Sequence, residues 1–226
     1  MSIELSISVR EDALFSEWKV HRPAFVADGV VNETDYIGSS PRLLFVLKEV
    51  NDPDGGDWDL REFLRTGGRP ATWDNLARWI EAIRSPTILP WEQIETIDIQ
   101  RRTAALRSIA AVNLKKTPGW YTSDPNEVSR FADEDSKFLR LQIDLYKPHL
   151  VICCGTGDWY KHIMDASNLR EWRRTNRGVW YYVDATDVPV LAFAHPEARV
   201  PAQYLHYALL DAVRELRGSL PQTTLR

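Results

Sequence analysis

The chain has 226 residues, of which 44% are hydrophobic, so it can fold around a packed core and does not have the composition of a disordered chain. Its formal net charge is −4, whereas tight non-specific DNA binding needs a basic face. Cationic side chains nevertheless cluster in two stretches, which are Arg101, Arg102, Arg107, Lys115 and Lys116, and then Arg170, Arg173, Arg174 and Arg177. Either cluster is equally compatible with a solvated helix or loop face.

The two cysteines, Cys153 and Cys154, are adjacent in an apolar run. Neighbouring side chains on a strand point to opposite faces, so these two cannot bridge each other. We expect both to be small buried hydrophobic residues, which fits a reducing compartment. No apolar run is long enough to cross a membrane, and residues 1–10 lack a signal-peptide pattern. We therefore predict a cytoplasmic protein without a membrane partner.

In the first half of the chain, hydrophobic spacing predicts helices over residues 11–21 and 72–84, the second with Thr72 as its N-cap. Residues 22–41 read as a loop. The continuous apolar run at residues 43–47 predicts a buried parallel strand, and the Asp, Pro and Gly residues that follow it predict a loop. A short helix is expected over residues 59–64, and residues 85–100 give no clear pattern.

In the second half, we expect residues 101–108 to end a helix and residues 109–114 to form a strand. Asp124 and Pro125 then open a long helix over residues 126–146, interrupted at most near residues 132–133. The remaining pattern predicts strands at 150–154, 180–183 and 190–194 and helices at 158–168 and 201–217. Strands that alternate with helices imply a three-layer α/β/α sandwich with a short central parallel sheet, and one domain over residues 1–226 is the simplest account.

Three predicted strands end at polar residues of unusual type. The strand at 43–47 runs into Glu49, Asn51 and Asp52, the strand at 109–114 carries Asn113, and the last strand ends at His195. In an open α/β sheet, ligands bind outside the carboxyl ends of the strands. The sequence therefore predicts that an acid, an amide and a histidine converge on one pocket, large enough for a small molecule or a base.

The order of these segments resembles the uracil-DNA glycosylase superfamily, over roughly residues 42–217. The resemblance is carried by four segments: Leu44 to Pro53 as a strand running into a water-activating loop, Val112-Asn113-Leu114 as the base-reading strand end, Tyr146-Lys147-Pro148 through Gly155, and His195-Pro196 as the leaving-group loop. It implies the fold of that superfamily and cleavage of an N-glycosidic bond in DNA, with no metal, redox cofactor or covalent intermediate. The glycines at 155 and 157 alone are a weak dinucleotide signal.

The resemblance also implies a role for each residue of the site. His195 would stabilise the departing base, and Asn113 would read its edge. Trp58 or Phe63 would stack on a base flipped out of the helix. Arg199, with Lys115 or Lys116, would contact phosphate or close the pocket.

Two features of the motifs leave alternatives open. The water-orienting group is Asp52 in one register and Glu49 in another, with Asn51 as the amide that some members use instead. Glu197 stands where the superfamily usually has serine, and a carboxylate beside His195 would favour protonation of its ring. Either the substrate differs from uracil in DNA, or Glu197 points away.

Three functions fit these patterns. The first is a glycosidase acting on a uracil-like or deaminated base in DNA. The second is a catalytically silent protein that binds a modified base or a nucleotide in the same pocket. The third is a hydrolase of free nucleosides or nucleotides, which the negative net charge favours.

Overall fold

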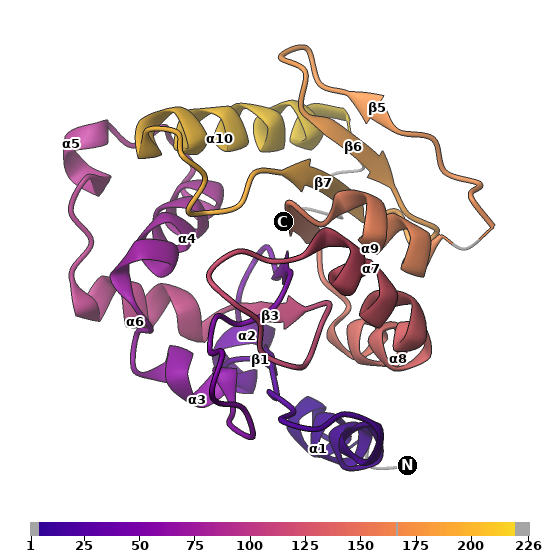
Figure 1. Ribbon diagram of the computed structural model, residues 1–226. Coiled ribbons are helices and arrows are strands. Elements are labelled where there is room, and N and C mark those ends of the chain that lie inside the picture. Colours follow the sequence, from indigo (N-terminus) through magenta and orange to yellow (C-terminus); the bar gives the residue numbers. More distant parts are fainter. Residues whose placement is uncertain (1–4, 166, 220–226) are drawn as a thin grey trace.

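The computed structural model describes residues 5–165 and 167–219, and its strands form a single seven-stranded sheet in the order β1-β3-β2-β4-β7-β6-β5 (Figure 1). The strands are β1 (Gly29–Val30), β2 (Leu43–Leu47), β3 (Ala110–Asn113), β4 (Leu150–Cys154), β5 (Arg173–Arg174), β6 (Trp180–Val183) and β7 (Pro189–Phe193). The central four, β3-β2-β4-β7, are parallel, as predicted. The sheet as a whole is mixed, because β1 pairs with β3, and β6 with β7 and β5, in antiparallel fashion.

The helices cover both faces of this sheet. They are α1 (Ile7–Trp18), α2 (Glu33–Ile37), α3 (Leu60–Arg65), α4 (Pro70–Arg84), α5 (Trp91–Ile94), α6 (Ile99–Arg107), α7 (Pro125–Glu134), α8 (Ser136–Tyr146), α9 (Gly157–Met164) and α10 (Ala202–Ser219), with a 3₁₀ turn, η1 (Lys19–His21), after α1. Among the described residues, no helix is both long enough and apolar enough to cross a membrane.

The strand side chains alternate between two hydrophobic clusters, as expected for strands buried on both faces. Leu43, Phe45 and Leu47 of β2 face the cluster formed with α3, α4, α6 and α10. Leu44 and Val46 face the other cluster, formed with α1, α7, α8 and α9. Figure 1 shows these two helical layers on either side of the sheet, which gives the three-layer arrangement. Cys153 and Cys154 are buried on opposite faces, as predicted.

Two helix starts show how local chemistry sets the boundaries. α4 begins with Pro70 in its first turn, two residues before the predicted N-cap, so Thr72 is not the cap. Asp124 caps α7 by accepting the Asn126 backbone N–H, and Pro125 is the first helical residue, as predicted. The predicted interruption lies at Asp135, between α7 and α8.

The parallel strands place their carboxyl ends on one edge of the sheet. The chain leaves β2 toward α3 on one face and leaves β3 toward α7 on the other, while β2 lies between β3 and β4. Such a reversal of winding opens a crevice at the strand ends, where ligands bind in open α/β sheets. The segments that follow β2, β3 and β7 therefore meet at this edge.

Candidate functional site

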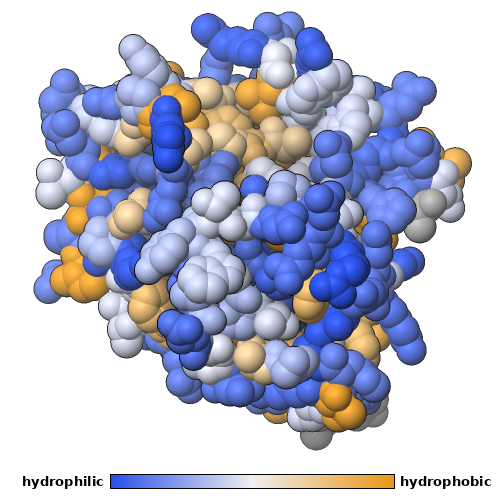
Figure 2. Space-filling view, viewed as in Figure 1, coloured by the Kyte–Doolittle hydropathy of each residue, from blue (hydrophilic) through white to orange (hydrophobic). Residues whose placement is uncertain are grey.

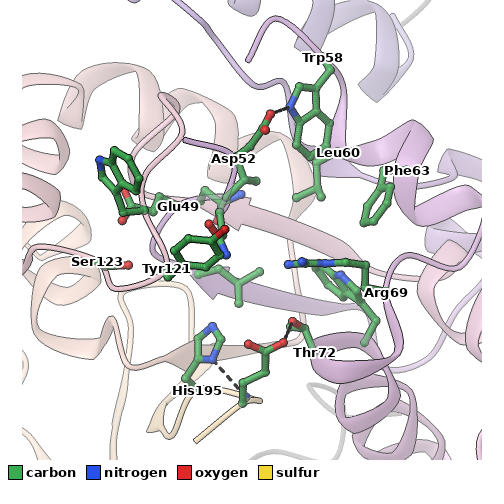
Figure 3. Close-up of a pocket in the computed structure, with 17 residues that line it drawn as sticks. Glu49, Asp52, Trp58, Leu60, Phe63, Arg69, Thr72, Tyr121, Ser123 and His195 are labelled. Carbon is green, nitrogen blue, oxygen red and sulfur yellow. Dashed lines mark hydrogen bonds between the residues drawn. The ribbon is translucent and has the colours of Figure 1, made fainter. Parts of the chain in front are cut away.

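A cavity of about 480 Å³ lies at this edge of the sheet. Its walls come from the segments after β2, β3 and β7 and from α3 and α4, as Figure 3 shows. All seven residues predicted to form the catalytic and base-binding groups line it: Glu49, Asn51, Asp52, Trp58, Phe63, Asn113 and His195. Residues far apart in the sequence are thus brought into one pocket of a size suited to a small molecule or a base.

His195 is held with one ring nitrogen inside its own loop and the other free for a ligand. Its Nδ1 accepts the Glu197 backbone N–H at 3.1 Å, while the opposite nitrogen points into the cavity (Figure 3). Burial lowers the pKa of His195, and nearby Lys48 lowers it further, although Glu197 opposes both effects. The ring is therefore neutral at neutral pH, and because Nδ1 is an acceptor, the proton resides on Nε2. His195 presents an N–H donor to the cavity.

The carboxylate of Glu197 is directed toward α4. Its Oε1 accepts the Thr72 hydroxyl at 2.6 Å, and the side chain is exposed. Asn75, also in α4, donates to the Pro196 carbonyl at 2.7 Å. The His195 loop is therefore tied to α4 through two hydrogen bonds. Glu197 and Thr72 both line the cavity, so the carboxylate lies at its wall, where the Thr72 hydroxyl occupies one of its oxygens.

Asp52 and Trp58 form a second pair on the cavity wall. The Trp58 indole N–H donates to Asp52 Oδ2 at 2.9 Å, and the Trp58 ring meets Phe63 edge to face, with centroids 5.9 Å apart. This bond fixes the carboxylate and the plane of the indole together. It leaves Asp52 Oδ1 open, because no hydrogen bond to that atom is found in the described part of the chain.

Glu49 is held by an ion pair instead. Its Oε2 lies 2.5 Å from Lys115 Nζ, and both side chains are almost completely buried. Lys115 also contacts Glu127 of α7 at 2.9 Å. Buried charges are tolerated only when paired in this way, so Glu49 and Lys115 fasten the segment after β2 to the segment after β3.

Asn113 lies at the end of β3 and is nearly buried. Its backbone N–H donates to Asp28 Oδ2 at 2.8 Å, which anchors the end of the strand. No other described residue hydrogen-bonds to its side-chain amide, and Asn113 lines the cavity. An amide offers a donor and an acceptor side by side, and Asn113 can therefore pair with a ligand edge that has the complementary pattern.

The predicted phosphate contacts are placed differently. Lys116 is fully buried, with its ammonium 2.5 Å from Asp28 Oδ1, and Lys115 is occupied by Glu49 and Glu127. Neither lysine can reach a phosphate without breaking a buried ion pair, so neither is placed for the predicted phosphate contact. Arg199 is exposed but does not line the cavity, and its role stays a prediction.

The sequence analysis missed six polar or aromatic residues of the wall: Arg69, Thr72, Trp73, Trp120, Tyr121 and Ser123. Trp120 is 66% exposed and Tyr121 83% exposed, in the segment between β3 and α7. The sequence did contain a pattern that could have identified them: two adjacent aromatic residues follow a Pro-Gly pair just beyond the end of a strand. Figure 3 shows the Tyr121 ring over the mouth of the cavity, opposite Arg69.

The surroundings of the site are mostly polar. Figure 2 shows hydrophilic side chains over α7 and α9 and hydrophobic ones gathered over α10. Within the described residues, no group of three or more histidine, cysteine or carboxylate side chains is placed to hold a metal ion. Searches with the whole chain find no matching protein-family model and no matching curated protein.

Proposed function

We propose that this protein is a glycosidase with the uracil-DNA glycosylase fold, which cleaves the N-glycosidic bond of a uracil-like or deaminated base flipped out of DNA. The observation that carries the proposal is the state of His195, a neutral ring with its N–H donor aimed into a cavity that also contains Asn113. A departing pyrimidine anion needs such a donor at its oxygen, and a positively charged ring is not required.

Each wall of the cavity matches one demand of this reaction. As water bonds to the sugar C1′ and gives up a proton to the carboxylate beside it, the C1′–N bond breaks. The base leaves with the bonding electrons and is later protonated from solvent, so charge develops on both fragments in the transition state. His195 would stabilise the anionic base, and Asn113 would pair with its edge. Trp58, supported by Phe63, offers an aromatic face for stacking. A carboxylate would orient the water and stabilise the cationic sugar.

The contacts favour Asp52 over Glu49 as that carboxylate. Glu49 is buried and its charge is balanced by Lys115, so its main effect is to hold the loops together. Asp52 is only partly buried and keeps one oxygen open while Trp58 fixes the other. We infer that Asp52 orients the water, with Asn51 beside it in the cavity wall.

The test is release of base from labelled oligonucleotides that contain uracil, hypoxanthine, xanthine or only ordinary bases. Wild type is compared with His195→Ala, Asn113→Ala, Asp52→Ala and Glu49→Ala, each checked for folding by circular dichroism. We expect His195→Ala and Asp52→Ala to lower release at least a hundredfold, which is the usual size of such contributions. Glu49→Ala should mainly lower stability. Absence of release from every substrate by the folded wild type would contradict the proposal.

The ion pair between Glu49 and Lys115 also supports a second candidate. If Glu49 occupies the position of the water-activating acid, its ion pair with Lys115 removes the charge that would activate water. The pocket would then bind a modified base or nucleotide without cleaving it. Thermal stabilisation by nucleotides without base release would favour this candidate, whereas release from free nucleosides or nucleotides alone would favour a hydrolase of small substrates.

A further inference from the structure

A second cavity, of about 660 Å³, opens at the same edge of the sheet on the side of α9. Three indole rings line it, from Trp159 in α9, Trp172 before β5, and Trp180 at the start of β6. We call it the tryptophan groove, and its remaining wall is Gly155, Thr156, Gly157, Asp158, Ala192 and Phe193. In Figure 1, α9, β6 and β7 lie beside one another around this site.

The groove is open to an aromatic ligand, and two of its rings, Trp159 and Trp172, pack against the buried core. Trp180 is 42% exposed, and the other two indoles are partly exposed. Trp172 is fixed edge to face against buried Tyr182, with centroids 5.0 Å apart. Gly157 allows the start of α9 to lie close to β7 at the base of the groove, because a Cβ at this position would lie 2.6 Å from the Ala192 side chain. Partly exposed indoles that are held rigidly make stacking surfaces at little entropic cost.

Cationic groups accompany the rings. The Arg174 guanidinium lies 3.9 Å from the centroid of the Trp180 ring, and the Lys48 ammonium lies 6.0 Å from that of Trp159. Asp158 is the only carboxylate among the described lining residues. Arg173 and Arg174 are exposed, and no described carboxylate pairs with either. By contrast, all five residues of the other basic cluster, including Arg101, Arg102 and Arg107, are paired with acids.

Lys48 lies close to both cavities, although it lines neither. It follows β2 directly, its side chain packs near Gly155 and Trp159, and its charge acts on His195 in the pocket. A phosphate near Lys48 would therefore stand between the two cavities. Aromatic faces alternating with cations are the pattern by which proteins bind the bases and backbone of a single strand.

We propose that the tryptophan groove stacks an unpaired nucleobase of a nucleic-acid strand whose neighbouring nucleotide occupies the pocket, with Lys48 at the phosphate that joins them. The inference rests on the proposed function for the occupant of the pocket. It deepens that function by naming a single-stranded or locally opened polynucleotide as the substrate class, because a free nucleotide cannot fill both cavities.

The experiment compares binding of a fluorescent eight-residue thymidine oligomer, a hairpin duplex and thymidine monophosphate. We expect wild type to bind the oligomer at least tenfold more tightly than the monophosphate, and more tightly than the duplex. Trp159→Leu and Trp180→Ala should each weaken oligomer binding about tenfold and leave monophosphate binding unchanged. Lys48→Met should weaken oligomer binding. It should also reduce the slope of log affinity against log salt concentration by about one, as expected for the loss of one phosphate contact. Trp91→Leu, a partly exposed tryptophan of α5 outside the groove, is the control.

The outcomes separate the two proposals. The groove proposal would be overturned if wild type bound the oligomer and the monophosphate with equal affinity. It would also be overturned if both groove variants bound the oligomer as tightly as wild type. Tight oligomer binding that depends on Trp159 and Trp180, by a protein that releases no base from any substrate, would support the groove while removing the glycosidase. Loss of folding in a variant is detected by circular dichroism, and Trp180→Phe, which keeps an aromatic face, should then retain most of the binding.

Discussion

Trp58 joins two functions in one side chain, because its indole N–H anchors Asp52 while its ring forms part of the cavity wall. Trp58→Phe keeps an aromatic face and removes the donor. A hydrogen bond to a charged group contributes about 1.5–3 kcal/mol, so we expect base release to fall by roughly tenfold or more. The measurement is kcat/KM for the proposed base release.

Phe63→Leu is the matched control for Trp58→Phe, since Phe63 touches the same ring without contacting Asp52. It should change release by only a few-fold. If Trp58→Phe were as active as wild type, the anchoring of Asp52 would have no part in the reaction.

Glu197 acts on the charge state of His195 from the cavity wall, where its carboxylate accepts the Thr72 hydroxyl. Burial and Lys48 lower the pKa of His195, whereas Glu197 raises it. Glu197→Gln keeps an acceptor for Thr72 and removes the charge, so the acidic limb of the pH–rate profile should move toward lower pH. The shift should be small, because Glu197 is exposed and its charge is screened. A limb that moves toward higher pH would contradict this assignment.

For single residues, the direction of the parallel strands was enough to predict which side chains meet in the site. Ion pairs between residues far apart in the sequence could not be predicted. Asn113 and His195 follow apolar runs that had to be strands, and parallel strands end at one edge, so their convergence followed from the pattern. Lys116 is buried against Asp28, which directly precedes β1, and no sequence pattern indicated that this segment pairs with β3. Propensity and periodicity contain no information about such partners.

Gly119 is where two loops of the site touch. Its N–H donates to the Val50 carbonyl, its carbonyl accepts the Asp52 N–H, and a Cβ on it would lie 2.1 Å from the Glu49 carboxyl carbon. Gly119→Ala must therefore displace the segment after β2. We expect it to cost about 1–3 kcal/mol of unfolding free energy and to lower base release. In a Glu49→Ala background, which provides space, Gly119→Ala should cost much less, whereas additive costs would contradict the contact.

The elements themselves were predicted best where periodicity was long or the apolar run was uninterrupted. The boundaries of β2 and β4 match the prediction, and α4 and α10 differ by two residues at most. Four short elements, β1, α2, α5 and β5, were missed. A two-residue strand such as β1 exists because β3 offers it an edge, and a five-residue helix such as α2 is fixed by its cap, so neither has a period to detect.

The whole fold contains a fully buried ion pair beneath the site. Asp28 accepts the Lys116 ammonium, the Gln142 amide and the Asn113 backbone N–H. Asp28→Ala would leave the lysine buried without a partner, at a cost of about 3–5 kcal/mol in urea denaturation. Asp28→Ala combined with Lys116→Met should recover part of that loss. Equal stability of the single and double variants would show that the charge of Lys116 is not the source of the cost.

A second buried group makes the stability of the whole molecule depend on pH. His206 of α10 is 1% exposed, lies beside Trp91 and Tyr207, and neither ring nitrogen has a hydrogen-bond partner among the described residues. Burial, with a smaller effect of Arg78, lowers its pKa to about 4. Between this value and the ordinary histidine pKa of 6.5, His206 is neutral in the folded protein, whereas in the unfolded chain it binds a proton.

This difference in proton binding fixes the direction of the effect. Between pH 6.5 and about 4, the unfolded state binds more protons, so the free energy of unfolding falls as the pH falls, by about 2–3 kcal/mol at pH 4.5 from this group alone. His206→Phe keeps a ring against Trp91 and cannot titrate. We expect wild type to lose about 2 kcal/mol more than His206→Phe between pH 7 and pH 4.5 in urea denaturation, since the carboxylates that also titrate there are common to both proteins. Parallel stability curves for the two proteins would contradict a neutral, buried His206.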